Sequence, residues 1–241
     1  EKHSATVVSG TVALKAVPKE AIKMVAACDE TVLAAPDLAH LHGLPVQPLF
    51  RQQYHAITGE RSDRGVLAEV TLPKLRTLDE LPVTARRLLA VHDVRDAANL
   101  GMLVRSVAGL EWDGIVIVGS GTSDPFCLPS IRASTGLVFQ VPIYTCDTLG
   151  AIKWPAVYAE VQKKLPAALK DTAPQKLAPG IDIYGEPIDQ SGPLVLAVGN
   201  EQFGFDLIKD IRPDHFAVLR VAEAVGSLNV AIAGSILMQA L

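Results

Sequence analysis

The sequence has little cysteine, few aromatic side chains and no long apolar run. Its 241 residues include three cysteines, Cys28, Cys127 and Cys146, and 5% aromatic residues. An odd number of cysteines without C-x-x-C spacing argues against a disulfide framework and against a zinc site. We therefore expect a reducing intracellular compartment, cytoplasmic or mitochondrial. No metal site is predicted, because the spacing of metal ligands is also missing among His40, His42, His55, His92 and His215.

No apolar run reaches the length that a membrane-spanning helix needs, about 18 residues. Hydrophobic residues make up 49% of the chain and charged residues 20%, which is typical of a soluble globular protein. The most apolar segment, residues 230–241, is too short to span a bilayer and contains Ser235 and Gln239. We expect it to form a helix of the core. The length allows one large domain, or a medium domain with a small companion.

An excess of positive charge is also missing. The net charge is −4, whereas proteins that bind nucleic acid mainly through phosphate contacts are usually basic. Residues 1–75 are balanced, so the negative excess lies in the remainder. Any affinity for RNA must come from a local patch or from a partner. The candidates are Lys2, Lys15, Lys19, Lys23, Arg51, Arg61, Arg64 and the pair Arg86 and Arg87, although each of these alone is more typical of an ordinary solvated surface.

The order of apolar and polar segments indicates two domains. Residues 1–72 alternate short helical and strand-like segments and end in an apolar strand at residues 65–70. Residues 73–84 are polar, contain Pro73 and Pro82, and are predicted to form a linker. Residues 85–241 then form the second domain.

The second domain is predicted to be α/β. A buried strand at residues 88–91, an amphipathic helix at 99–110 and a strand at 114–118 begin a βαβ unit. Further strands are expected at residues 138–144, 182–184, 194–198 and 217–221. Further helices are expected at residues 130–135, 155–169, 207–211 and 228–240.

Gly119-Ser-Gly121 follows a strong strand and resembles the start of a dinucleotide-binding fingerprint. The pattern then fails, because Asp124 occupies the third glycine position. Pro125 and Pro129 also follow where a long helix should open. A nucleotide-dependent oxidoreductase has only this incomplete pattern in its favour, so we expect a polar loop at the end of a strand.

Three other segments carry a more specific signal. They are Asn99-Leu-Gly-Met-Leu-Val-Arg105, Leu194-Val-Leu-Ala-Val-Gly-Asn-Glu201 and Gly226-Ser-Leu-Asn-Val-Ala-Ile-Ala233. In order and spacing they resemble the three motifs of the SpoU/TrmH group of RNA 2′-O-ribose methyltransferases, in the SPOUT superfamily. The resemblance covers roughly residues 86–241. It implies a knotted parallel-sheet methyltransferase domain preceded by a small α/β domain that binds the RNA substrate.

The front domain resembles its counterpart in the family less closely. The match begins after the usual start of that domain, because the basic stretch that often opens it is missing. We therefore expect this domain to be incomplete at its N-terminus. In the second domain the resemblance implies a deep trefoil knot that forms a pocket for S-adenosylmethionine. Gly199, Leu219 and Leu228 would give backbone contacts to the cofactor, and Asn229 would open the final helix. That helix would also pack in a dimer interface, with a second copy or with a related subunit.

The resemblance assigns catalysis to Asn99, Arg105, Glu201, Ser227 and Asn229. The reaction would be in-line attack of a ribose 2′-hydroxyl on the methyl group of S-adenosylmethionine, which requires alignment and loss of a proton. Arginine is a poor base because it stays protonated. We therefore expect Arg105 to position and stabilise the RNA, with Arg132 as a second RNA contact, and Asn99 to cap its helix. Ribosomal RNA is favoured over transfer RNA because a separate front domain is present.

Two departures from the family pattern leave a second hypothesis open. Gln202 stands where glycine is usual, and Arg220 stands in place of a proline beside the expected adenine pocket. The loop at residues 222–226 is altered as well. These changes are compatible with a SpoU-fold ribosome-assembly or RNA-binding factor that has lost S-adenosylmethionine binding.

Overall fold

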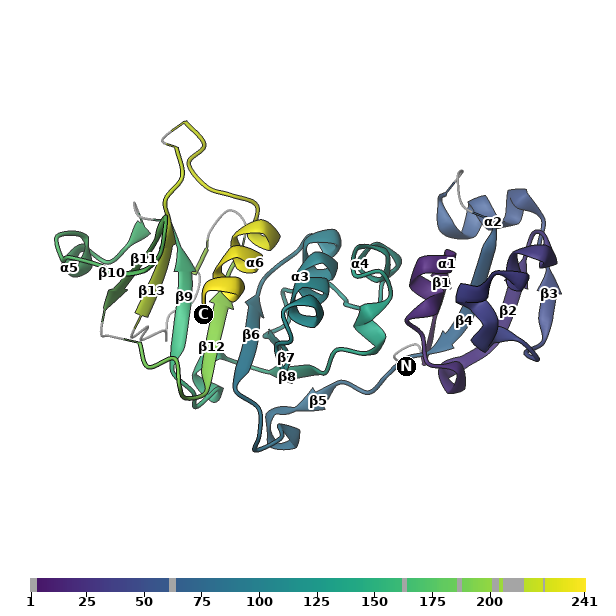
Figure 1. Cartoon of the computed structure of the whole chain (residues 1–241), viewed down its shortest axis with the longest axis horizontal. Helices are drawn as coiled ribbons and strands as arrows, with labels where there is room; N and C mark the ends of the chain where they lie inside the picture. Colours follow the sequence, from purple (N-terminus) through teal and green to yellow (C-terminus); the bar gives the residue numbers. More distant parts are fainter. Residues whose placement is uncertain are drawn as a thin grey trace.

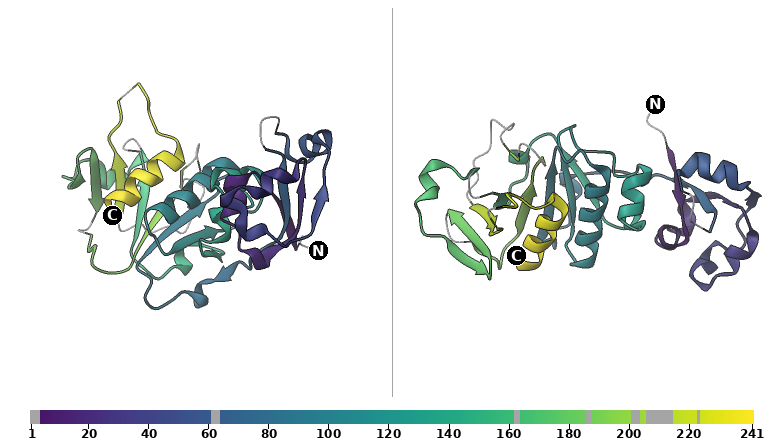
Figure 2. Two further views of the ribbon diagram at one scale, coloured as in Figure 1. Left: turned by 45° about the vertical axis from the view of Figure 1, so that its right-hand side comes forward. Right: turned by 90° about the horizontal axis from the view of Figure 1, so that it is seen from above.

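The computed structural model describes residues 4–60, 64–161, 164–185, 188–200, 204–205, 215–222 and 224–241. Its strands form two separate sheets, one in the front domain and one in the second domain. Figures 1 and 2 show the front domain at one end of an elongated molecule. No helix in the described ranges is long and apolar enough to cross a membrane. The same residues contain no cluster of potential metal ligands.

The front domain contains a four-stranded sheet in the order β1-β4-β2-β3. The strands are β1 (Ala5–Ser9), β2 (Ile22–Ala27), β3 (Val46–Pro48) and β4 (Val66–Thr71). The helices are α1 (Thr11–Lys15) and α2 (Arg51–Thr58), and α2 is an element that the sequence interpretation missed. Its end is signalled in the sequence by Gly59, which adopts a left-handed conformation that terminates the helix.

The second sheet has nine strands in the order β10-β11-β13-β9-β12-β6-β7-β8-β5. All pairs from β13 to β5 are parallel, and the β10–β11 hairpin joins β13 antiparallel. The strands in chain order are β5 (Arg76–Thr77), β6 (Arg87–His92), β7 (Gly114–Val118), β8 (Ile143–Cys146), β9 (Ala156–Glu160), β10 (Gln175–Ala178), β11 (Ile181–Gly185), β12 (Leu194–Val198) and β13 (His215–Leu219). The mixed α/β fold is as predicted, and the knot implied by the resemblance stays a prediction. The segment predicted as a linker contributes β5 to the sheet edge.

The central strands are apolar on both sides because both faces of the sheet are covered. Along β6, Leu89 and Val91 face one core cluster, while Leu88 and Ala90 face the other. Helix α3 (Ala97–Gly109) packs on the first face together with α6 (Val230–Ala240). Near-continuous apolar strands are typical of such buried parallel sheets.

Helix α3 forms because its sequence supplies both a cap and an apolar stripe. The Asp96 side chain accepts a hydrogen bond from the backbone N–H of Asn99 at 2.8 Å, which caps the helix. Buried residues recur at helical spacing along one face, at Leu100, Leu103, Val104 and Val107. The expectation that Asn99 caps this helix is therefore wrong, since Asp96 fills that position and Asn99 lies inside the first turn.

The helix predicted at residues 155–169 is also wrong. Its first part is β9, a central strand between β12 and β13, and the α-helix found among the described residues of this segment is the four-residue α5 (Ala167–Lys170). The alanine and lysine content favours helix locally, but Val157 and Tyr158 suit a buried strand, and tertiary pairing decides the outcome. The strand predicted at 138–144 is shorter than expected, because residues 137–139 form a turn of 3-10 helix. The helix predicted at 207–211 lies outside the described residues.

Helix α4 (Leu128–Ala133) of the second domain contacts the front domain. Arg132 forms an ion pair with Glu60 of the front domain, with Nε 2.8 Å from Oε1, and donates a hydrogen bond to the Thr58 carbonyl. Thr6 donates to the carbonyl of Phe126 at 3.0 Å. These observed contacts give Arg132 a structural role between the domains, and its contact with RNA stays a prediction.

Candidate functional site

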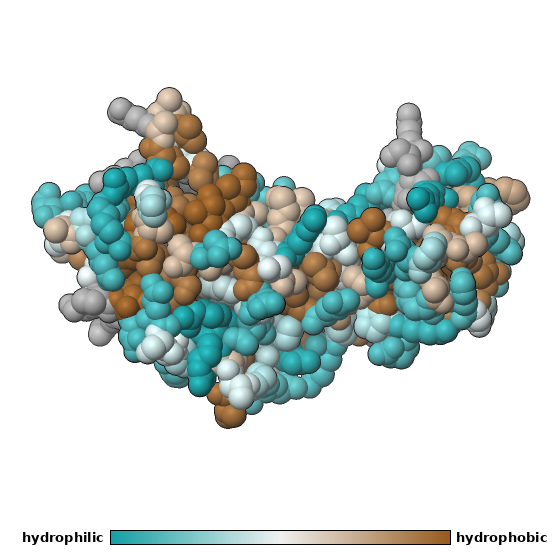
Figure 3. Space-filling view, in the orientation of Figure 1, coloured by the Kyte–Doolittle hydropathy of each residue, from teal (hydrophilic) through white to brown (hydrophobic). Residues whose placement is uncertain are grey.

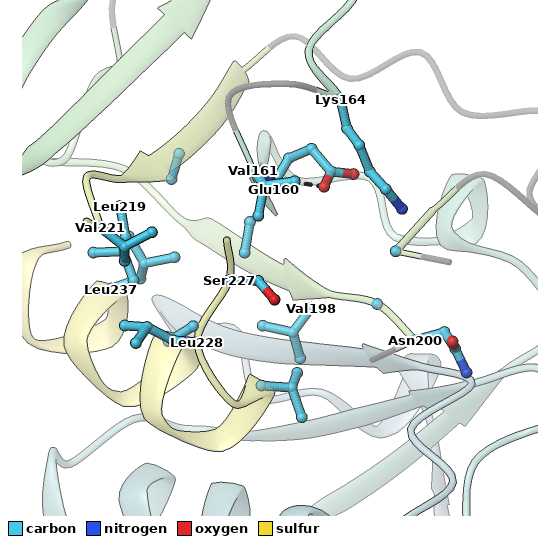
Figure 4. Close-up of a pocket in the computed structure, with 16 residues that line it drawn as sticks. Glu160, Val161, Lys164, Val198, Asn200, Leu219, Val221, Ser227, Leu228 and Leu237 are labelled. Carbon is cyan, nitrogen blue, oxygen red and sulfur yellow. Dashed lines mark hydrogen bonds between the residues drawn. The ribbon is translucent and has the colours of Figure 1, made fainter. Parts of the chain in front are cut away.

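A pocket lies at the carboxyl edge of the parallel sheet, where β9, β12 and β13 end side by side (Figure 4). Ligands of parallel α/β sheets usually bind at this edge. Helix α6 and the loop before it close one side. The pocket is lined by Ala159, Glu160, Val161, Lys164, Val198, Gly199, Asn200, Gly204, Ala217, Leu219, Val221, Ser227, Leu228, Val230, Ala233 and Leu237.

The pocket has an apolar side and a polar side. Leu219, Val221 and Leu237 lie together on one side, with Leu228 at the start of the final helix (Figure 4). Glu160, Lys164, Asn200 and Ser227 bring polar groups to the remainder. Such a cavity suits a ligand with an apolar ring at one end and charged or hydroxyl groups at the other.

Two glycines form the loop that follows β12. Asn200 and Gly204 exchange backbone hydrogen bonds of 3.1 and 2.8 Å. A Cβ atom on Gly199 would lie 2.5 Å from the Gly204 carbonyl oxygen, so only glycine allows this approach. Gly204 itself has a φ of 59°. The two glycines therefore let the backbone line the pocket directly.

The structure brings the predicted cofactor residues together. Gly199, Leu219 and Leu228 come from three separate segments and line the same pocket. Ser227, predicted to act in catalysis, lines it as well. Glu201 and the altered position Gln202 lie outside the described residues.

Asn99 and Asn229 connect the two helices beside the pocket. The side-chain Oδ1 of Asn229 accepts hydrogen bonds from the N–H groups of Ala231 and Ile232, and thereby caps α6 as expected. Its amide group donates to the Asn99 side-chain oxygen at 2.8 Å. Asn99 is 7% exposed. Two residues 130 positions apart thus form one polar link at the start of both helices.

Arg105 lies elsewhere on the same helix. It is exposed, because the buried stripe of α3 faces the sheet, and it does not belong to the pocket lining in the described part of the chain. Met102, three residues earlier, shares its side of the helix and is also exposed. Its catalytic assignment stays a prediction.

Arg220 is not among the described residues that line the pocket. Its guanidinium donates two hydrogen bonds, of 2.7 and 2.9 Å, to the buried carboxylate of Asp182 in β11. Lys176 of β10 contacts the same carboxylate at 2.7 Å. The guanidinium is thus engaged with Asp182, and the expected charge beside the adenine site stays a prediction. Arg220 attaches the β10–β11 hairpin to the end of β13.

Arg220→Ala is expected to lower the free energy of unfolding by about 1–2 kcal/mol. Burial raises the pKa of the Asp182 carboxyl, and loss of the bidentate partner leaves this carboxylate with Lys176 alone. Urea unfolding at neutral pH measures the change. Lys74→Ala, which removes an exposed ion pair with Glu80, is the matched control and should cost less than about 0.5 kcal/mol. Equal effects of both variants would contradict this role.

Asp93 and Asn200 are site residues that the sequence interpretation missed. Asp93 follows β6, has a φ of 54° and is 6% exposed. Its carboxylate accepts from Arg95 Nε at 2.9 Å and from the Asn200 amide at 3.0 Å, and Asn200 also donates to the Asp93 carbonyl. Burial lowers the pKa of the adjacent His92 imidazole, while the charge of Asp93 opposes this effect. The contacts orient Asn200 at the pocket.

The predicted polar loop at Gly119-Ser-Gly121 lies beside Asp93. A Cβ atom on Gly121 would lie 2.2 Å from an oxygen of the Asp93 carboxylate, so the second glycine of the incomplete fingerprint makes room for a side chain. No long helix opens after it, since the next helix is the six-residue α4. The dinucleotide interpretation has no support in this geometry.

Asp93→Ala is expected to lower the free energy of unfolding by about 2 kcal/mol, because the buried Asn200 amide loses its side-chain acceptor and alanine is strained at the positive φ of this position. The free energy of unfolding of Asp93→Gly should be about 1 kcal/mol higher than that of Asp93→Ala, since glycine adopts a positive φ without strain. Thermal and urea unfolding of both variants test this. If the glycine variant is the less stable of the two, backbone conformation is not what this position requires.

Comparison with known proteins places this geometry in context. The model of the SpoU rRNA Methylase family matches residues 86–239, which is more than half of the chain. The 23S rRNA (guanosine(2553)-2′-O)-methyltransferase RlmP of Bacillus subtilis is 27% identical over 205 residues, covering 81% of this chain and 72% of the Bacillus protein. An uncharacterized tRNA/rRNA methyltransferase of Mycolicibacterium smegmatis is 24% identical over 216 residues; the match covers 87% of this chain and 65% of that relative.

A solved structure has the same fold. The AdoMet-bound rRNA methyltransferase from Sinorhizobium meliloti superimposes with a TM-score of 0.71, at 24% sequence identity. The match covers 98% of this chain and 86% of the Sinorhizobium chain. Both domains therefore follow one common architecture.

Proposed function

Because the chain belongs to the SpoU rRNA methylase family, we propose that it transfers a methyl group from S-adenosylmethionine to a ribose 2′-hydroxyl of RNA, with ribosomal RNA as the favoured substrate. The observation that carries this proposal is the convergence of Gly199, Leu219 and Leu228 on one pocket. The hydrogen-bonded pair Asn99 and Asn229 lies at the start of the helix that closes it.

The residues of the pocket fit S-adenosylmethionine. The apolar side around Leu219, Leu228 and Leu237 suits an adenine ring, and the glycine loop at Gly199 and Gly204 offers backbone groups without side chains in the way. The polar side suits a ribose and an amino acid. When bound, S-adenosylmethionine supplies an electrophilic methyl group. The engagement of Arg220 with Asp182 weakens one sequence-based objection to this fit.

The chain has to hold the ribose 2′-hydroxyl in line with the methyl group beside the pocket, and the hydroxyl proton would leave to water. The hydrogen bond between Asn99 and Asn229 keeps the first turns of α3 and α6 at a fixed distance from each other, which preserves the geometry of the pocket wall. Ser227 presents a hydroxyl from the loop before α6. Arg105 is assigned to the RNA, where its guanidinium binds phosphate and stabilises negative charge on the attacking oxygen.

Binding and methyl transfer test the proposal. We expect isothermal titration to detect micromolar binding of S-adenosylmethionine, and labelled methyl to enter ribosomal RNA but not DNA of the same sequence, since DNA lacks the acceptor hydroxyl. Binding of RNA with no binding of S-adenosylmethionine would contradict the proposal and favour the ribosome-assembly factor. Arg220→Pro is not expected to improve binding, because the Arg220 N–H donates to the Gly180 carbonyl and its side chain holds Asp182.

We further propose that the chain pairs with a second copy or with a related subunit through α6. Ile232 and Ile236 lie one turn apart on its outer face and are 51% and 41% exposed. Figure 3 shows hydrophobic surface gathered over this region. Large exposed apolar patches are typical of interaction surfaces. Light scattering tests the pairing: a dimer that Ile232→Asp dissociates supports it, and a monomeric parent protein argues against self-pairing.

A further inference from the structure

Two opposite charges lie on the polar side of the pocket. Glu160 ends β9, and Lys164 lies four residues later in the sequence. Both side chains extend toward the same part of the pocket (Figure 4). A Cβ atom placed on Gly204 would lie 2.9 Å from Glu160 Oε2 and 3.5 Å from Lys164 Nζ. The carboxylate and the ammonium group are therefore neighbours beside the glycine loop.

The fold holds Glu160 in place. Glu160 belongs to a strand that pairs on both sides, with β12 and with β13, so its backbone is fixed. Its Oε1 atom accepts a hydrogen bond from the Val161 N–H at 2.9 Å, and Oε2 is the oxygen nearer Gly204. Glu160 and Lys164 are both partly buried, and charge interactions at such positions are screened less than on an open surface.

No other charge belongs to the pocket lining in the described part of the chain, since the remaining lining residues are apolar, glycine, asparagine or serine. The charges of Glu160 and Lys164 complement a ligand that carries one positive and one negative group close together, and the apolar side of the pocket suits an attached ring system. Resting on the proposed function, we propose that Glu160 binds the α-ammonium group of the methionine part of S-adenosylmethionine and that Lys164 binds its α-carboxylate. The pair would thus select for the complete amino acid.

Ligand analogues test this assignment one group at a time by isothermal titration. The parent protein should bind S-adenosylmethionine at least about tenfold more tightly than decarboxylated S-adenosylmethionine, because the latter lacks the group for Lys164. Lys164→Met should weaken S-adenosylmethionine about tenfold and leave the decarboxylated analogue unchanged. Methylthioadenosine lacks the amino acid altogether, and its affinity should be the same for parent and variant.

Glu160→Gln should weaken S-adenosylmethionine and S-adenosylhomocysteine equally, by about tenfold, because both carry the ammonium group. Loss confined to S-adenosylmethionine would mean that Glu160 instead faces the sulfonium, and would overturn the assignment. Unchanged methylthioadenosine binding shows that the variant pocket is intact. Lys153→Met, an exposed lysine outside the pocket lining, is the control and should change nothing.

The two proposals fail in different ways. If the parent protein binds neither S-adenosylmethionine nor methylthioadenosine, the proposed function fails. If the parent binds both, but Lys164→Met and Glu160→Gln keep the parent's preference among the analogues, only the recognition of the amino acid by this pair is wrong.

Discussion

Replacement of Gly199 by alanine is expected to weaken S-adenosylmethionine binding by about a hundredfold, or about 2.7 kcal/mol. The new Cβ atom would lie 2.5 Å from the Gly204 carbonyl oxygen and 2.7 Å from its carbon. These are backbone atoms, so no rotation of a side chain can relieve the contact. The loop must move away from Gly199, and this motion breaks its hydrogen bonds with Asn200 and displaces one wall of the pocket.

Isothermal titration measures the loss, and thermal unfolding checks that the fold survives. Gly109→Ala is the matched control, since a Cβ atom there meets no heavy atom within 4 Å and the residue belongs to helix α3. We expect this variant to bind S-adenosylmethionine as the parent does. Full affinity of the Gly199→Ala variant would mean that the glycine loop does not contact the ligand.

Arg105→Ala is expected to lower the rate of methyl transfer by about 10² to 10³, the usual effect of removing one group that stabilises charge in a transition state. S-adenosylmethionine affinity should stay unchanged, because Arg105 is exposed on α3 and does not belong to the pocket lining among the described residues. The expected signature is thus a defect in RNA methylation without a defect in cofactor binding.

Rates with saturating S-adenosylmethionine and varied RNA separate positioning from chemistry. Arg105→Lys should recover only part of the rate, since lysine keeps the charge but not the planar fork of donors. Arg76→Ala, an exposed arginine of the edge strand β5, is the control. Parent-like methylation by Arg105→Ala would exclude the assignment, and loss of S-adenosylmethionine binding would show that the residue acts on the pocket instead.

The sequence predicted most central elements of the second domain correctly, because their patterns are local. The apolar strands that became β6, β7 and β12, and the apolar stripe of α3, are visible in short windows. The cap of α6 by Asn229 was also predictable, since an asparagine precedes an apolar helical run. The prediction of a helix at residues 155–169 was wrong for the opposite reason. The composition favours a helix locally, but pairing with β12 and β13, which are distant in the sequence, makes the first part of this segment a strand.

The sequence by itself determined the family, the parallel α/β core and the set of residues at Gly199, Leu219 and Leu228. These features depend on motif order and on apolar periodicity, both of which are visible in the sequence alone. Only the tertiary structure decided where single polar side chains point. It turned Arg220 toward Asp182 and placed Arg132 against Glu60. It also joined Asn200 to Asp93 and set Glu160 beside Lys164. A charged side chain interacts with whichever group the fold brings within a few ångströms, and that partner is not encoded in its own neighbourhood of the chain.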